Sequence, residues 1–341
     1  MIIRTSGHPR AGLVGNPSDG YFGKTIAFTF KNFRAEVMLY QTPELEILPN
    51  TRDHSRFSSI HALAKDVRLF GYYGGIRLLK AAVKRFHDYC TEHGIRLDDR
   101  NFTIRYHTDI PSQVGLAGSS AIITACMRAL MNFYDVNIPK PILPNLILSV
   151  ENKELGISAG LQDRVAQVYE GLIYMDFDQA IMDRQGHGLY EELDPALLPP
   201  LYVAYREDLS EGSWITHNVL RHRFNEGDPE VLAAMRFWAD LTVKVRDALF
   251  QRRTGDIPAL LNANFDRRRA LYGRIGQAIS PDNIAMVETA RSVGASAKFS
   301  GSGGAIVGTY TDEAMFQRLG EALAAIHVKV IKPDIARPGK D

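Results

Sequence analysis

The sequence predicts an α+β fold, in which strands and helices are mixed without the regular alternation that builds a parallel sheet. Three observations lead to this prediction. The chain has 341 residues, enough for two domains or one large one. Its composition, 45% hydrophobic and 23% charged, is that of an ordinary globular protein. Segments with the two-residue period of strands lie between segments with helical spacing in both halves of the chain.

Charge and cysteine content narrow the class of protein. The 40 basic and 39 acidic residues leave a net charge of +1, and no basic run predicts a nucleic-acid partner. Cys90 and Cys126 lie in helical patterns and form no disulfide framework. No apolar run is long enough to span a bilayer, and the first ten residues lack the apolar core of a signal peptide. We therefore expect a cytoplasmic protein with no membrane partner.

Residues 1–50 are expected to form strands around a turn rich in Gly, Asn, Pro and Asp. This turn lies in VGNPSDGYFGKT, residues 14–25, whose Gly-Lys-Thr ending is shared with Walker-type phosphate loops. Such a loop requires Gly where this chain has Ser18, and it must open a helix. Residues 25–30 instead alternate as a strand does, so the ending is interpreted as accidental.

The elements that follow have clear periods. Apolar residues at helical spacing predict a helix within residues 71–90, and alternation predicts a strand over 101–110. Residues 121–136 are apolar nearly all round, which predicts a buried helix. A further helix over 145–155 should end at Gly156, before a strand over 171–177. Tyr72 and Tyr73 leave two interpretations open: they line a nucleotide base, or they only begin a packed helix.

Residues 183–200 are polar and then rich in Pro, and they are the candidate boundary between domains over 1–190 and 191–341. The second half predicts a strand at 201–205 and long helices over about 230–262 and 282–293. A Gly/Ser loop precedes a strand within 298–310, and another helix leads to a last strand within 327–333.

The strongest local signal lies between a predicted strand and the buried helix. Pro111 ends the strand, and Gly115 and Gly118 allow the backbone to turn tightly and approach a ligand. Ser119 and Ser120 stand where the helix starts, as N-cap residues do. The free amides and positive dipole at that end favour phosphate. A capped helix after a flexible loop is the alternative interpretation.

Two further segments are candidates for chemistry. Glu151 and Asp163 are separated by two Gly-containing turns. A kinase needs one carboxylate near its metal ion and another near the attacking hydroxyl. Two surface acids on neighbouring helices are the alternative. The glycines and serines of residues 298–308 form either a plain turn or a loop packed beneath phosphates.

Taken in order, these segments resemble the motifs of the GHMP kinase superfamily over nearly the whole chain. The phosphate-loop motif is matched by Pro111, Gly115, Leu116, Gly118, Ser119, Ser120 and Ala121, with Ala117 making the loop one residue longer than the commonest form. The acidic motif is matched, at the spacing of galactokinases, by Glu151, Gly156, Gly160 and Asp163. The last motif is matched by Lys298, Gly301, Gly303 and Gly304.

The resemblance implies a two-domain fold, an N-terminal phosphate-loop domain and a C-terminal ferredoxin-like α+β domain. It also implies ATP and Mg²⁺. The residues implied to cradle the phosphates of ATP are Gly115, Leu116, Ala117, Gly118, Ser119, Ser120 and Ala121, with Lys298, Gly301 and Gly303. Ser120 and Glu151 are implied to hold the metal ion. Asp163 is implied to accept or orient the proton of the substrate hydroxyl, and Arg10 to face the transferring phosphate.

The opening turn resembles the sugar-binding motif of galactokinase-like members, in which Asn16 and Asp19 are implied to contact the sugar. Asn16 and Pro17 replace the Glu and His of that motif, so galactose itself is not predicted. The stretches GNPSDGYFG, GYYGGIRLL, ELGISAGLQDRVAQVY and NFDRRR are similar to the glucuronokinase branch. That similarity implies phosphorylation of D-glucuronate at its anomeric hydroxyl. The alternatives are a kinase for another sugar or a non-catalytic sensor with the same fold.

A uronate substrate carries a carboxylate, whose unpaired burial is costly, and Arg is its best partner. Arg268 falls on the helix face of Asn264 in NANFDRRRALYG, whereas its two neighbouring arginines point away. We therefore expect Arg268 to contact the carboxylate, with Arg164 as the competing candidate. The alternative is that all three arginines are solvated or pair with Asp266. A small molecule is the expected partner, and the oligomeric state is left open.

Overall fold

The computed structural model describes residues 1–50, 53, 59–60, 74–207 and 213–336, except for the side chains of 213–218. The chain forms two compact units that interleave along the sequence. The first unit consists of residues 1–9, 33–110 and 117–168, and the second of residues 10–32, 111–116 and 169–341. The predicted phosphate loop therefore contributes residues to both units.

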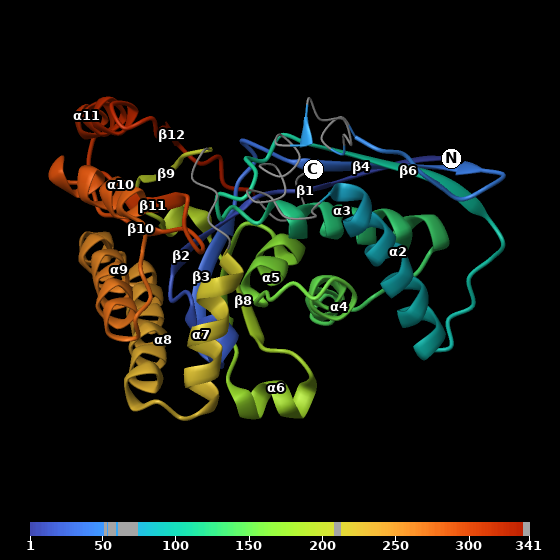
Figure 1. The fold of residues 1–341 in the computed structure, drawn as a ribbon, viewed down its shortest axis with the longest axis horizontal. Helices are drawn as coiled ribbons and strands as arrows, with labels where there is room; N and C mark the ends of the chain where they lie inside the picture. Colours follow the sequence, from blue (N-terminus) through green and yellow to red (C-terminus); the bar gives the residue numbers. More distant parts are fainter. Residues whose placement is uncertain (51–52, 54–58, 61–73, 208–212, 337–341) are drawn as a thin grey trace. The chain divides into compact units, whose positions relative to one another are not determined.

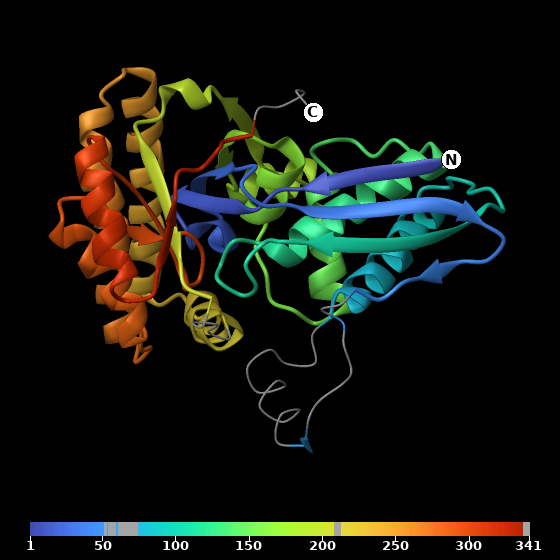
Figure 2. The same ribbon diagram turned by 90° about the horizontal axis from the view of Figure 1, so that it is seen from above.

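The sheet of the first unit is mostly antiparallel. Its strands, in spatial order, are β1 (Ile2–Gly7), β4 (Ala35–Thr42), β6 (Asn101–Thr108) and β5 (Glu46–Ile47). Figure 2 shows the long strands side by side, with β4 between β1 and β6. The short β5 pairs in parallel with β6. The predicted strand at 101–110 is confirmed by β6.

Helices cover one face of this sheet. α3 (Gly118–Tyr134) packs against β1 and β4, and α2 (Gly75–Glu92) packs against α3. The predicted burial of α3 nearly all round is confirmed. At the end of β1 a Cβ on Gly7 would lie 2.3 Å from the carbonyl oxygen of Ala121. Only glycine permits the strand to approach the start of α3 this closely.

The acidic segment begins on a widened helical turn. α4 (Leu143–Ser149) continues into a π-helical turn, η3 (Val150–Glu154), which carries Glu151. Gly156, at φ +66°, follows the end of this helix, which confirms the predicted stop. α5 (Gln162–Tyr169) then begins one residue before Asp163. π-helical turns occur frequently at functional sites.

The second unit contains two antiparallel sheets. The first has the order β2 (Arg10–Val14), β3 (Lys24–Thr29), β7 (Leu172–Asp176) and β8 (Leu189–Leu193). Residues 18–21 form a 3₁₀ turn, η1 (Ser18–Tyr21), between β2 and β3. A strand and not a helix follows Gly23-Lys24-Thr25, which confirms that this stretch is not a Walker loop.

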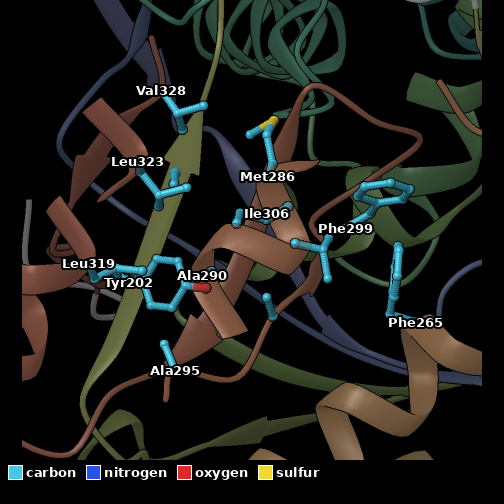
Figure 3. Packing of buried hydrophobic residues seen from close by; sticks show 13 residues of the cluster. Tyr202, Phe265, Met286, Ala290, Ala295, Phe299, Ile306, Leu319, Leu323 and Val328 are labelled. Carbon is cyan, nitrogen blue, oxygen red and sulfur yellow. The ribbon is translucent and has the colours of Figure 1, made fainter. Parts of the chain in front are cut away.

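The second sheet of this unit has the order β10 (Lys298–Phe299), β11 (Ala305–Thr309), β9 (Leu201–Tyr205) and β12 (Lys329–Ile331), with α11 (Glu313–Ala324) before β12. Chain order strand–helices–strand–strand–helix–strand with this pairing is the ferredoxin-like arrangement, as predicted. Its core includes Tyr202, Phe265, Met286, Phe299 and Leu319 (Figure 3).

The long helices of the second unit differ from the prediction in one respect. The α-helices between β9 and β10 are α7 (Ser213–Asn225), α8 (Pro229–Phe250), α9 (Ile257–Arg274) and α10 (Pro281–Ser292). The single helical stretch expected over 230–262 is wrong, because Arg252 adopts φ +55° and ends α8. A 3₁₀ turn, η5 (Thr254–Asp256), then leads into α9, which has Pro in its first turn. α8 and α9 lie side by side (Figure 1).

The segment around the candidate boundary is itself structured. Residues 183–200 include the end of α6 (Gln179–Gln185), strand β8 and a 3₁₀ turn, η4 (Pro195–Leu197). The compact units divide the chain at other positions, and the boundary at residue 190 stays a prediction. Among the described helices, none combines the length and apolar character needed to cross a membrane.

Candidate active site

The two glycine-rich loops of the second unit lie against each other. Gly115 has φ +73°, and a Cβ built there would lie 2.7 Å from the carbonyl oxygen of Gly303. A Cβ on Gly301 would lie 2.6 Å from the carbonyl oxygen of Gly115. Backbone packs directly on backbone, so any side chain at Gly115 or Gly301 would force the loops apart. Two segments far apart in sequence are thus brought together, as their shared resemblance to phosphate-binding motifs implies.

Arg10 spans these two loops. Its guanidinium donates from Nη1 to the carbonyl oxygen of Gly115 at 3.2 Å and to that of Ser300 at 3.0 Å. The backbone amide of Arg10 also donates to the carbonyl oxygen of Leu116 at 3.1 Å. The side chain is buried, so the structure places a fixed positive charge between the loops.

Lys298 is buried behind the loops. Its Nζ donates at 2.5 Å to the carbonyl oxygen of Gly12 and at 2.5 Å to Oδ1 of Asn16. Burial, together with repulsion from Arg268 and Arg10, holds the pKa of the Lys298 ammonium well below its ordinary value. Lys298 therefore ties β10 to the end of β2 and to residues 15–23, the turn between β2 and β3. This turn is called the sugar-binding turn below, after its predicted role.

Arg268 holds the last glycine-rich loop. It donates from Nη1 to the carbonyl oxygen of Gly301 at 2.8 Å and from Nη2 to that of Ser302 at 3.2 Å. Its guanidinium carbon lies 5.1 Å from the ring centroid of Tyr272 and 5.2 Å from that of Phe299. Arg268 and Asn264 are 3% and 1% exposed, as expected for two residues that share one face of α9.

The neighbours of Arg268 behave as the helical spacing predicts. Asn264, one turn earlier, is buried and accepts at Oδ1 from the amide of Gly15 at 2.8 Å. Arg269 pairs instead with Glu288 at 2.8 Å, and Asp266 pairs with Arg291 at 2.7 Å. The alternative that all three arginines are solvated or pair with Asp266 is therefore wrong.

The first unit contributes the start of α3. The N-cap residue is Ala117, at φ +62°, and no side chain caps the helix. The prediction of Ser119 or Ser120 as N-cap is wrong, because the helix already begins at Gly118. Ser119 Oγ donates to Glu151 Oε1 at 2.9 Å, and Ser120 Oγ donates to the carbonyl oxygen of Ala117 at 3.1 Å. Both hydroxyls stand in the first turn, where backbone amides are unpaired.

The two predicted acids share one arginine. Arg164 forms an ion pair with Glu151 through Nη2, and its Nη1 lies 3.4 Å from Oδ2 of Asp163. Its Nη1 also donates to the carbonyl oxygen of Gly160 at 2.9 Å. The side chains of Arg164 and Glu151 are 4% and 2% exposed, whereas that of Asp163 is 21% exposed. Asp163 is thus the acid of the pair that a ligand reaches more readily.

The sugar-binding turn holds residues that the sequence analysis did not single out. Asp19 lies in the first turn of η1, and Tyr21 at its end is buried. Burial raises the pKa of Tyr21, and the charges of Arg221 and Arg268 lower it. Arg221 of α7 donates from Nη1 to the carbonyl oxygen of Gly20 at 2.8 Å. No sequence motif marks Arg221, because α7 meets this turn only in the folded chain.

Two other residues outside the prediction contact predicted site residues, one within each unit. Gln167 is buried in the first unit and donates from Nε2 to the carbonyl oxygens of His8 and Ala117 at 3.0 and 2.9 Å. Tyr272 of α9 is buried beside Arg268. Tyr272 follows Arg268 by four residues, so helical spacing was the available signal for it. Tyr72 and Tyr73, with Gly71, lie outside the described residues.

Known proteins are similar in sequence over this site. The model of the "GHMP kinases N terminal domain" family matches residues 77–171, which include the phosphate loop and both acids. Glucuronokinase 1 of Arabidopsis thaliana is 46% identical over 301 residues, covering 87% of this chain and 82% of that protein. The chain belongs to the GHMP kinase family. Probable glucuronokinase 2 of the same plant is 47% identical over 302 residues, or 87% of this chain and 81% of that protein.

Solved structures show the same fold at lower identity. A Lin0012 protein from Listeria innocua matches with a TM-score of 0.78 at 14% identity, over 99% of this chain and 98% of the other. Galactokinase of Lactococcus lactis, complexed with galactose, matches with a TM-score of 0.75 at 14% identity, over 99% of this chain and 94% of the other. The predicted GHMP kinase fold is confirmed.

Family membership makes the chain a glucuronokinase-like kinase. The predicted resemblance and enzyme class are therefore confirmed. The roles of individual side chains are not tested by these matches, and they stay predictions. In the structure, Arg10, Arg268 and Lys298 donate hydrogen bonds to oxygen atoms of the protein itself.

Proposed function

We propose that this GHMP kinase transfers the γ-phosphoryl group of ATP to the anomeric hydroxyl of D-glucuronate, giving glucuronate 1-phosphate. The similarity to two glucuronokinases over 87% of the chain carries the proposal. Arg10, Ser120, Glu151 and Asp163, the implied catalytic and metal-binding set, are all present, which argues against a non-catalytic sensor. A kinase for a neutral sugar is the second candidate, since the chain shares its fold with the galactokinase of Lactococcus lactis.

The charge inside the second unit supports an anionic ligand. Arg10, Arg268 and Lys298 are all buried, and no described Asp or Glu of this unit is buried. Their mutual repulsion is one cause of the lowered pKa of Lys298. A cluster of buried basic side chains gives a positive local potential, which attracts anions. We propose that this potential favours the phosphate and carboxylate groups of the substrates.

The residues of the first unit fit a magnesium ion. Glu151 supplies a carboxylate, and the first turn of α3 supplies the hydroxyls of Ser119 and Ser120. Mg²⁺ prefers oxygen ligands and is commonly bound by one or two carboxylates together with substrate phosphates. When bound, the ion would neutralise charge on the phosphates. We propose that Glu151 and Ser120 hold it and that Ser119 orients Glu151.

The remaining roles follow from how phosphoryl transfer is catalysed. It requires mainly positioning and electrostatic stabilisation. We propose that backbone amides of residues 115–121 hold the phosphates, that Arg10 offsets charge on the transferring group, and that Lys298, Gly301 and Gly303 support the loop. Asp163 accepts or orients the proton of the sugar hydroxyl, and Asn16 and Asp19 contact the sugar. The carboxylate requires a further cation, for which Arg268 and Arg164 stay the candidates predicted by sequence.

A sugar panel tests the proposal. ATP, Mg²⁺ and the purified protein are incubated with D-glucuronate, D-galacturonate, D-glucose and D-galactose, and ADP release and sugar 1-phosphate are measured. We expect D-glucuronate to give the highest kcat/KM. A higher kcat/KM for a neutral hexose would favour the neutral-sugar kinase. Binding of a sugar without turnover for any of them would favour the sensor.

A further inference from the structure

Arg221 lies across the sugar-binding turn. Its guanidinium carbon is 4.7 Å from the ring centroid of Tyr21, and its Nη1 donates to the carbonyl oxygen of Gly20 at 2.8 Å. A Cβ on Gly20 would lie 3.3 Å from Nη2, so this turn leaves space for the guanidinium. The ring of Phe224, one helical turn later, packs 4.9 Å from that of Tyr21. The end of α7 is therefore fastened to the turn, and Arg221 is held flat on it.

The two arginines predicted from the sequence are engaged elsewhere. Arg268 is buried between two aromatic rings and holds the carbonyl oxygens of Gly301 and Ser302. Arg164, in the first unit, is shared between the two acids of the proposed catalytic set. A substrate carboxylate would have to compete with protein oxygens for either guanidinium. If Arg268 bound the substrate carboxylate, the loop at residues 301–302 would lose its hydrogen bonds. If Arg164 did, the two acids would lose their cation.

Arg221 offers what the other two do not. Its residue is exposed, and its one hydrogen bond within the described part of the chain is the one to Gly20. A guanidinium has five N–H donors in a planar fork. Stacking on Tyr21 and the bond to Gly20 fix the plane of this fork, so little side-chain entropy is left to lose when it binds a carboxylate.

The position of Arg221 also suits a sugar acid. It contacts the same four-residue turn that carries Asp19, the residue proposed to bind sugar hydroxyls. Asp19 and Arg221 both act on the pKa of Tyr21, in opposite directions. The carboxylate of Asp19 and the guanidinium of Arg221 are thus both placed at this turn. This arrangement fits a ligand that presents both hydroxyls and a carboxylate.

We propose that Arg221 binds the carboxylate of the uronate substrate and so selects sugar acids over neutral sugars. The proposal rests on the proposed function of the chain. Arg268 then serves only to hold the loop at residues 301–302 through its two hydrogen bonds. A carboxylate can accept two parallel, charge-assisted hydrogen bonds from Arg221. The hydroxymethyl group of a neutral sugar, or an amide, forms a weaker contact, and this difference is the basis of the selectivity.

The test compares two substrates of nearly the same shape, one with a carboxylate and one with a neutral carboxamide. Arg221→Met and a control, Arg223→Met, are assayed with D-glucuronate and with D-glucuronamide. Arg223 lies on the same helix and pairs with Asp228 at 3.0 Å, on another face. We expect Arg221→Met to raise the KM for glucuronate about ten- to a hundredfold and that for glucuronamide by less than about threefold. Arg223→Met should leave both values near those of the wild type, and Arg221→Lys should recover part of the loss.

Three results overturn the proposal. The first is an unchanged KM for glucuronate in Arg221→Met. The second is an equal loss for glucuronate and glucuronamide, which would mean that Arg221 only supports the turn. The third is a selective loss in Arg268→Met with none in Arg221→Met, which assigns the carboxylate to Arg268. A wild-type protein that phosphorylates neither compound would instead refute the proposed function, and this inference with it.

Discussion

At the scale of single residues, one arginine lies between the two acids of the proposed catalytic set. Arg164 forms a buried ion pair with Glu151 and also approaches Asp163. A buried carboxylate without a partner is strongly unfavourable, and Arg164 supplies that partner for Glu151 inside the first unit. The side chain of Asp163 is more exposed, at 21%, and we propose that it accepts or orients the proton of the substrate hydroxyl.

Asp163→Asn should lower kcat by at least about a hundredfold and leave the affinity for ATP nearly unchanged. General-base assistance is worth on the order of 10²–10⁴ in rate, and the amide cannot accept the proton. Turnover is measured by ADP release, and nucleotide affinity by equilibrium titration. Asp176→Asn is a matched control, because Asp176 is a partly buried acid that pairs with Lys24. Near-normal turnover in Asp163→Asn would contradict the proposed mechanism.

Ser120→Ala should raise the Mg²⁺ concentration that gives half-maximal activity, and added Mg²⁺ should restore part of the rate. Its hydroxyl donates to Ala117, which leaves two oxygen lone pairs for a cation. Ser119→Ala should have a smaller effect, because Ser119 acts through Glu151. The measurement is an Mg²⁺ titration at fixed ATP for both variants. A shifted dependence in Ser119→Ala alone would show that Ser119 is the ligand.

At the scale of elements, a hairpin and a turn are joined by one buried ammonium. Lys298 stands at the start of the β10–β11 hairpin, whose loop packs on Gly115, and it donates to the end of β2 and to Asn16. The glycine-rich loop, the sugar-binding turn and β2 are therefore positioned together. Displacing one of them should displace the others.

The lowered pKa of Lys298 predicts a pH-dependent contribution to stability. Burial, with repulsion from Arg268 and Arg10, holds this pKa well below 10.5, the value of an ordinary lysine. In the window between the two values the unfolded chain binds the proton and the folded chain does not. The free energy of unfolding therefore rises with pH across that window.

Lys298→Met should lack this rise. The difference in unfolding free energy, wild type minus Lys298→Met, should increase as the pH rises toward about 10. It is measured by urea unfolding at several pH values. Tyrosines with raised pKa values are present in both proteins, so their effect cancels in the difference. A difference that stays flat across this range would show that the ammonium keeps its ordinary pKa.

At the scale of the whole molecule, the compact units do not follow the order of the chain. The second unit takes residues 10–32 and 111–116 from the first half of the sequence. Thr242 of α8 donates to the carbonyl oxygen of Lys24 at 2.8 Å, and Asn264 of α9 accepts from the amide of Gly15. The long helices of the second unit thus pack on strands that lie far before them in sequence.

A fragment of residues 191–341 should therefore fail to fold by itself. It lacks β2, β3 and β7, so the faces of α8 and α9 that contact β3 and β2 would be exposed. We expect binding of the dye ANS and little protection of amide hydrogens from exchange, in contrast to the full chain. Cooperative unfolding of the fragment, with protected amides, would show that the predicted domain is independent of the first half.

Much of the architecture could be predicted from local patterns. Alternation identified β3 and β6, and the uniformly apolar segment identified α3. The sequence does not predict the break between α8 and α9, because it depends on the left-handed conformation of Arg252. Residues other than glycine seldom adopt this conformation. The N-cap of α3 was misplaced for the same reason, since Ala117 is not a typical N-cap residue.

The sequence by itself determined the fold class, the family and the order of the motifs, because these depend on periodicity and on short spacings. It also determined that Arg268 lies on the helix face of Asn264, since helical spacing sets that relation. Only the tertiary structure decided which oxygens each cation holds. Arg268 binds a loop, Lys298 binds a turn, and Arg221 meets the sugar-binding turn from a helix about two hundred residues later. Such contacts arise from the packing of distant segments, which no local pattern records.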